Sequence, residues 1–162
     1  MCYLRHSSFY RLGHGMSPEN VRMVRESWEL ALPVSNELVT AFYARLFRAN
    51  PALSKLFEKT DMKEQRRKFI VMMSEIIRVI DQPQLLVSEV ADSGRRHVTY
   101  GVHDRDYEDV GAALLAALGD VLNERFTPQV RAAWREAYDL LAAVMRRAAG
   151  QATASGTPAS LT

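Results

Sequence analysis

The 162 residues, of which 48% are hydrophobic and 25% charged, suit one globular domain with a sizeable core. The formal net charge of +2 and the dispersed Lys and Arg residues give no indication of nucleic-acid binding. A single cysteine, Cys2, excludes an intramolecular disulfide and a CxxC zinc site, in agreement with a reducing compartment. The longest stretch without polar side chains, residues 111–119, is far shorter than the roughly 20 residues that span a bilayer. We therefore expect a cytoplasmic protein without a membrane span.

The two ends of the chain differ in composition from the segment between them. Residues 1–16 contain no apolar run long enough for a secretory signal, and we expect a poorly ordered leader there. Met16 is a candidate initiator, because Ser17 can cap a helix and Pro18 suits its first position. Residues 150–162 are mostly Ala, Ser, Thr and Gly, too poor in large apolar side chains to offset their ordering entropy. The sequence thus predicts a folded domain at 17–149 and a flexible tail.

Between these ends the apolar residues recur at the three- and four-residue spacing of helices, and no strand pattern competes. Prolines fall at the expected breaks: Pro33 interrupts the first stripe, and Pro83 and Pro128 suit the first turns of later helices. The pattern predicts an all-α fold with about seven helices of unequal length. In chain order, the expected stripes span residues 21–32, 38–46, 53–57, 69–80, 86–97, 107–121 and 130–145.

His97 continues the apolar stripe of the helix that begins near Pro83, seven residues after Val90 on the same face. An inward imidazole can be a core histidine with both nitrogens satisfied, or an axial ligand of haem iron. Gly94 and Gly101, on either side, suggest that something bulky approaches this backbone closely. Helical spacing alone leaves both interpretations of the histidine open.

Three further polar residues stand on or beside apolar faces, where a buried polar group without a partner is costly. Gln65 lies four residues before Phe69, Tyr43 immediately follows Phe42, and Tyr107 lies ten residues after His97. The simpler alternatives are a tyrosine bonded to a backbone carbonyl and a glutamine that faces water. A functional interpretation requires all three to line one pocket with His97.

Three segments carry a resemblance to a known family. FYARLFRANPALSKLF (42–57) is similar to the second and third helices of bacterial single-domain haemoglobins and of flavohaemoglobin haem domains. GRRHVTYGV (94–102) and FTPQVRAAWREAY (126–138) are similar to the neuroglobins. The chain therefore resembles a globin over about residues 18–149. This resemblance implies a globin fold, with about seven to eight helices that sandwich a haem b.

The resemblance also implies roles for individual residues. His97 matches the proximal ligand of the haem iron, and is the one metal ligand implied; Tyr107 matches a tyrosine that lies against it. Tyr43 and Gln65 match the distal pair of bacterial haemoglobins, so that with Tyr107 they are the candidate catalytic residues. The remaining implied cofactor contacts are Phe57, which stacks on the haem, Phe69, Val102, and Lys68, which either reaches a propionate or is a solvated lysine.

The chemistry that these residues imply is the binding of a diatomic gas. Ferrous iron held by a neutral imidazole can bind O2, and the ligand then acquires partial negative charge. Donation from Tyr43 and Gln65 would stabilise it by about 1 to 2 kcal/mol each. Neither side chain is a strong iron ligand, so we expect an open or loosely occupied sixth position. The proximal glutamate of flavohaemoglobins is replaced by Ala149, which favours reversible binding over peroxidase-like turnover.

Three functional hypotheses follow from the resemblance. The first is reversible O2 binding, storage or delivery, with CO and NO as further ligands, by a protein that is not an enzyme in isolation. The second is NO dioxygenation; because the sequence ends at Thr162, without flavin and nicotinamide domains, this activity would need an external reductase. The third, a gas or redox sensor, would be expected to carry a fused output domain. The first two hypotheses need the same site residues, so the sequence alone does not separate them.

Overall fold

The computed structural model describes residues 15–99 and 101–155, with the side chains of residues 15–97 and 101–151. Every regular element in these ranges is a helix, which confirms the all-α class expected from the apolar spacing. The elements in chain order are α1 (Pro18–Ala31), η1 (Leu32–Val34), α2 (Ser35–Ala49), α3 (Pro51–Lys55), α4 (Met62–Arg78), α5 (Pro83–Thr99), α6 (Asp106–Leu122), η2 (Asn123–Arg125) and α7 (Pro128–Ser155), where η marks a 3₁₀ turn.

The helix limits follow from local capping chemistry. The Ser17 hydroxyl accepts a hydrogen bond from the Asn20 amide at 3.1 Å, and the Asp61 carboxylate accepts from two amides at the start of α4. Thr127 Oγ1 accepts from the Val130 amide at 3.3 Å, immediately before Pro128. These caps satisfy amides that have no partner within their own helix, so the sequence signals and the observed ends agree.

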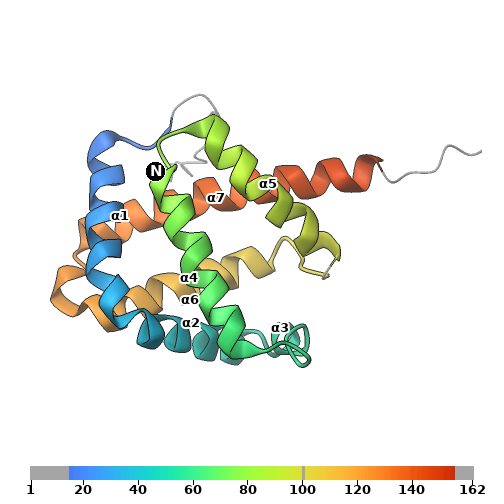
Figure 1. Cartoon of the computed structure of the whole chain (residues 1–162), viewed down its shortest axis with the longest axis horizontal. Helices are drawn as coiled ribbons and strands as arrows, with labels where there is room; N and C mark the ends of the chain where they lie inside the picture. Colours follow the sequence, from blue (N-terminus) through green and yellow to red (C-terminus); the bar gives the residue numbers. More distant parts are fainter. Residues whose placement is uncertain (1–14, 100, 156–162) are drawn as a thin grey trace, which may run out of the picture.

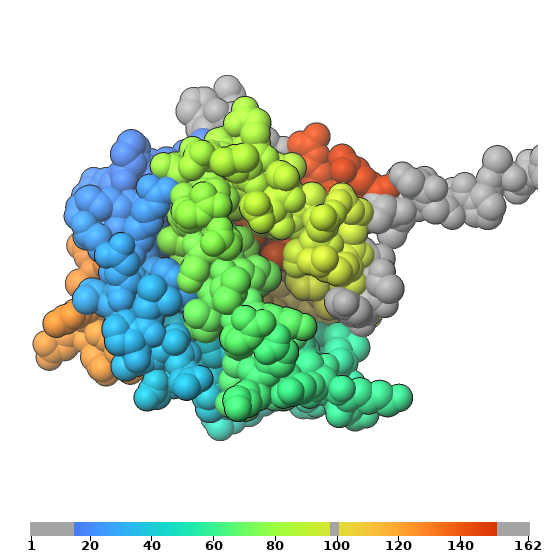
Figure 2. Space-filling view, viewed as in Figure 1, coloured from blue at the N-terminus to red at the C-terminus, as the bar shows by residue number. Residues whose placement is uncertain are grey.

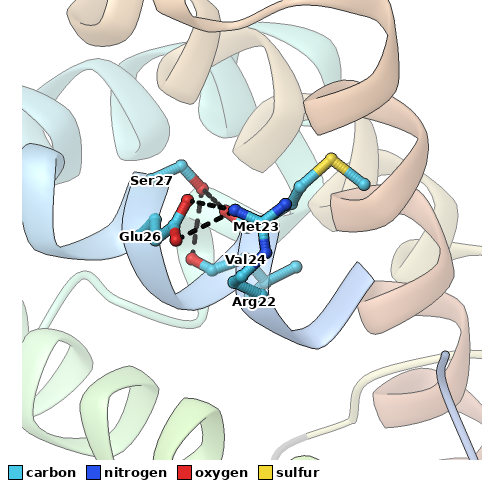
Figure 3. A network of polar contacts seen from close by, with 5 residues as sticks. All are labelled: Arg22, Met23, Val24, Glu26 and Ser27. Atoms are coloured by element: carbon cyan, nitrogen blue, oxygen red, sulfur yellow. Dashed lines mark hydrogen bonds and ion pairs between the residues drawn. The ribbon is translucent and has the colours of Figure 1, made fainter. Parts of the chain in front are cut away.

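The helices pack in crossed pairs around a main core. In Figure 1 α4 runs across the face of the molecule in front of α6 and α7, and the most extensive contacts join α5 with α7 and α2 with α6. Trp28 and Trp134 meet in the core with ring centroids 6.1 Å apart. Ser27 is the polar exception: its hydroxyl lies 2.6 Å from the Met23 carbonyl (Figure 3) and accepts from Trp134 Nε1 at 2.8 Å. Ser27 therefore has the partners that burial requires.

A second group of buried side chains lies beneath α5. It includes Ile76 from α4, Leu86 and Val90 from α5, Tyr107 from α6 and Met145 from α7. Each of these aliphatic side chains contributes about 1.5 to 3 kcal/mol when fully removed from water. This group fixes α5, which carries His97, against α6 and α7.

The two glycines around His97 differ in their surroundings. A Cβ added to Gly94 would lie 2.7 Å from the carbonyl oxygen of Met145 and 3.0 Å from its Cα. The bulky neighbour that the sequence predicts at Gly94 is therefore the backbone of α7. Gly101 has a φ of +80°, and a Cβ there would meet none of the described residues within 4 Å, so the close approach expected at Gly101 is not observed. Glycine suits that position because the backbone is left-handed after α5.

Both expected domain limits shift. Met16, which the sequence analysis placed in the leader, is buried and packs in the core. Helix α7 continues through Gly150 to Ser155, so the limit expected after Ala149 lies inside a helix. The physical reason is that Gln and Ala residues follow Gly150, and one glycine costs a helix only about 1 kcal/mol. The rest of the expected leader (1–14) and tail (156–162) lies outside the described residues.

Candidate functional site

A cleft opens between α4 and α5. Figure 2 shows it as a hollow between green atoms of α4 and yellow atoms of α5, with red atoms of α7 at its floor. A cavity of about 280 Å³ at its outer part is lined by Arg67, Lys68, Val71, Met72, Glu75, Ile76, Glu89 and Arg96. A larger cavity of about 430 Å³, near η2, contains none of the expected site residues. We therefore place the candidate site in the cleft.

Tyr43 and Gln65 meet on the α2 and α4 side of the molecule. Gln65 Nε2 donates a hydrogen bond to Tyr43 Oη at 3.1 Å, across the packed faces of the two helices. Tyr43 is buried, with 6% of its surface exposed, and Gln65 is half-buried. Because the tyrosine oxygen accepts this bond, its own hydrogen stays available, and among the described residues it has no acceptor. Burial is the main reason that the pKa of the Tyr43 hydroxyl is raised above 10, so this donor stays protonated near neutral pH.

Aromatic rings surround Tyr43. Phe57 lies edge-on to Tyr43 with ring centroids 5.6 Å apart, and Phe42, Phe47 and Phe69 lie 4.9, 5.5 and 6.1 Å away. Phe57 and Phe69, both expected as cofactor contacts, are half-buried. The Tyr43 side chain is thus buried among apolar rings, where a hydrogen bond is stronger than in water.

His97 and Tyr107 meet on the α5 and α6 side. Tyr107 Oη lies 3.5 Å from His97 Nδ1, at the outer limit of a hydrogen bond. Burial, with a smaller contribution from Arg96, lowers the pKa of the His97 imidazole below 6.5. The ring is therefore neutral at pH 7, the form that can ligate a metal. Since Nδ1 is turned to Tyr107, Nε2 is the nitrogen left for a ligand bond.

The other two expected contacts occupy different surroundings. Lys68 is exposed and lines the outer cavity, which Arg96 of α5 also lines. Val102 is half-buried and packs on the cluster that contains Tyr107. Lys68 therefore borders the cleft, whereas Val102 is not among the residues that line its cavity, and a contact of either residue with a cofactor stays a prediction.

Several residues that hold the site escaped the sequence analysis. Tyr138 Oη donates to the Tyr107 carbonyl at 2.5 Å, and a Cβ on Gly111 would come within 2.5 Å of the Tyr138 ring. Asp106 is buried, and its carboxylate accepts from the His103 amide at 2.7 Å and from the Asn50 side chain at 3.0 Å. The contacts of Tyr138 with Tyr107 and of Asp106 with Asn50 join separate elements, so no local spacing identifies them; only the Asp106 contact with the His103 amide is local.

The family is established by comparison with known proteins. A family model described as Globin matches residues 40–145, more than half of the chain. The chain belongs to the globin family. The resemblance seen in the sequence is thereby confirmed.

The relatives of this globin are longer proteins. It is 31% identical over 129 residues to a flavohemoprotein of Rhodopirellula baltica, covering 78% of this chain and 32% of the relative. It is 30% identical over 132 residues to a flavohemoprotein of Xylella fastidiosa, covering 80% and 33%. The chain thus spans about a third of the length of these relatives. Among the described residues of the globin, no helix is long and apolar enough to span a membrane.

A solved structure shares the fold of this globin. The hexacoordinated heme protein of an anhydrobiotic tardigrade superposes with a TM-score of 0.74. The match covers 83% of this chain and 96% of that one, at 17% sequence identity. The globin fold expected from the resemblance is therefore observed.

Membership of the family implies a haem, and the residues of the cleft fit one. The half-buried imidazole of His97 comes from α5, with Tyr107 Oη beside its Nδ1 and its Nε2 left for an iron bond. Apolar rings with two polar donors lie on the α2 and α4 side. The described residues contain no cluster of three His, Cys, Asp or Glu that could hold a metal ion in place of a haem.

Proposed function

We propose that this globin binds haem b, with His97 as the proximal ligand and Tyr43 and Gln65 as distal donors, and that it binds O2 reversibly. When bound, the haem supplies a ferrous iron that takes up diatomic gases. The observation that carries the proposal is the hydrogen bond from Gln65 to Tyr43, which leaves the Tyr43 hydrogen free for a ligand. A second free hydrogen remains on the Gln65 amide.

The surroundings of the two donors favour bound O2, which acquires partial negative charge, over bound ligands that acquire little charge. The Tyr43 ring is packed among phenylalanine rings and its hydroxyl is bonded to Gln65, so the pair needs little reorganisation to meet a partly negative ligand. Each donated bond adds about 1 to 2 kcal/mol. The binding of CO, which carries much less charge, gains less from the same donors.

The test of this function uses the purified protein with haem. Ferrous protein is exposed to air, and the spectrum of the oxygenated form is recorded during repeated oxygenation and removal of O2. Reversible binding predicts a stable oxygenated spectrum over several cycles. Oxidation of most of the protein to the ferric form within one cycle contradicts a carrier or storage role.

A second candidate is NO dioxygenation, and the similarity to flavohemoproteins favours it. The same Tyr43 and Gln65 donors would hold O2 while NO reacts with it, and a reductase would return the iron to the ferrous state. The test is stopped-flow mixing of the oxygenated protein with NO, followed by repeated additions in the presence of a flavin reductase and NADH. Sustained turnover identifies the dioxygenase; a single stoichiometric reaction favours the carrier.

A further inference from the structure

Arg146 occupies an unexpected position on the His97 side of the site. Its Cζ lies 5.1 Å from the centroid of the Tyr107 ring, above the ring. Arg146 Nη2 donates to the Asp104 carbonyl at 3.2 Å. Arg146 Nε is buried and has no hydrogen-bond partner among the described residues, and Asp104 Oδ1 lies 3.5 Å from it as an ion pair. A buried donor left unpaired destabilises the folded state, so its position calls for an explanation.

The ring beneath this cation connects directly to the proposed iron ligand. Tyr107 Oη lies 3.5 Å from His97 Nδ1, and the Tyr138 hydroxyl holds the Tyr107 carbonyl. If His97 Nε2 binds iron, Nδ1 carries the hydrogen and Tyr107 Oη is the acceptor. The strength of this long contact depends on how much electron density the phenol oxygen carries.

We propose that Arg146 is a positioning residue that keeps the His97 imidazole a weak electron donor, by holding its cation over the Tyr107 ring. The guanidinium draws density from the ring, so the Tyr107 oxygen accepts less strongly from His97 Nδ1. An imidazole whose N–H is weakly bonded is less basic, and a less basic ligand favours ferrous over ferric iron. The inference rests on the proposed ligation of haem by His97.

The neighbouring charges leave the cation dominant. Among the described residues, Asp104 is the carboxylate paired with Arg146, and its side chain is 83% exposed, so water screens it strongly. The Arg146 side chain is 36% exposed. The proximal glutamate of flavohaemoglobins is replaced in this chain by Ala149, three residues after Arg146 on α7. The charge beside Tyr107 is therefore positive, which favours retention of the ferrous form that binds O2.

The experiment compares uncharged variants of Arg146 with a matched control in the haem-loaded protein. Arg146→Gln and Arg146→Met remove the cation, Arg146→Lys keeps it, and Arg147→Gln removes an exposed cation from the next position of α7. The readouts are the midpoint potential and the iron–histidine stretching frequency of the ferrous protein. Thermal unfolding reports any structural loss separately.

The uncharged variants should shift the ferric-to-ferrous equilibrium about two- to tenfold toward ferric, where tenfold corresponds to 59 mV for one electron. The iron–histidine frequency should rise. Arg146→Lys should stay close to the unmodified protein, and Arg147→Gln should change neither readout. In a Tyr107→Phe background, most of the effect of Arg146→Gln should disappear, because the acceptor oxygen is gone.

Two results would overturn the role of Arg146. One is a potential in both uncharged variants no different from that of Arg147→Gln. The other is an undiminished shift in the Tyr107→Phe background, which would mean that the charge acts without the tyrosine. Either result, obtained with haem still bound through His97, leaves the proposed function intact. Full haem retention by a His97→Gly variant would instead refute the ligation on which both rest.

Discussion

Replacing Tyr43 by phenylalanine tests the distal arrangement most directly. The ring keeps its volume and its contacts with Phe57 and Phe69, so packing costs should be small. The hydroxyl that accepts from Gln65 at 3.1 Å, and whose hydrogen is free, is lost. Losing one donated bond of about 1 to 2 kcal/mol should raise the O2 dissociation rate roughly 5- to 30-fold.

The structure adds a prediction for the pair. Gln65→Leu should also accelerate O2 dissociation, because it removes a donor and the bond that orients the Tyr43 hydroxyl. The double variant should fall short of the product of the single effects, since the two groups are in contact. Burial keeps Tyr43 protonated, so the Tyr43→Phe effect should be the same at pH 6 and pH 8.

The assay is stopped-flow displacement of O2 by excess CO, with CO displacement by NO as the comparison. The CO dissociation rate should change much less than the O2 rate in all three variants. Equal acceleration of both ligands would mean that the residues act by steric gating, and the hydrogen-bond account would be refuted. Unchanged rates would mean that neither side chain faces the ligand.

Three further predictions concern the proximal side and stability. His97→Gly should yield protein with little haem, rescued by added imidazole, whereas loss of the exposed His103 side chain should leave the haem content unchanged; pyridine haemochrome spectra measure both. Gly94→Ala should lower the free energy of unfolding, measured in urea, by about 1 to 3 kcal/mol, because the added Cβ meets the α7 backbone. The control Gly150→Ala should raise it by up to about 1 kcal/mol. Equal effects of the two substitutions would contradict the contact at Gly94. Burial raises the pKa of the Tyr138 hydroxyl, so the unfolded state loses this proton at a lower pH than the folded state. The contribution of Tyr138 to the free energy of unfolding should therefore be fully present below about pH 10 and fall above it by up to about 1.4 kcal/mol per pH unit. Tyr138→Phe should flatten that slope; an unchanged slope would assign the effect to other tyrosines.

Local chemistry in the sequence was sufficient for the helices and for the direction of one key side chain. Caps such as Ser17 and Thr127 act within one turn, and the period of the apolar residues fixes which face is buried. For that reason the inward direction of His97 could be predicted, whereas the place of Tyr43 in the site came from the resemblance. The pairing of Tyr43 with Gln65 and of His97 with Tyr107 came from the resemblance, and the geometry agrees with it.

Tertiary packing alone decided what supports these residues. Gly94 is needed because the backbone of α7 packs closely against α5 at this position. The spacing around residue 94 does not predict contact with a helix that begins more than thirty residues later. Nothing in the sequence distinguishes Arg146 from an ordinary solvated cation, but in the structure its guanidinium lies over the ring of Tyr107. Such contacts depend on how separate helices cross, and a periodic pattern specifies which face of a helix is buried but not which partner it meets.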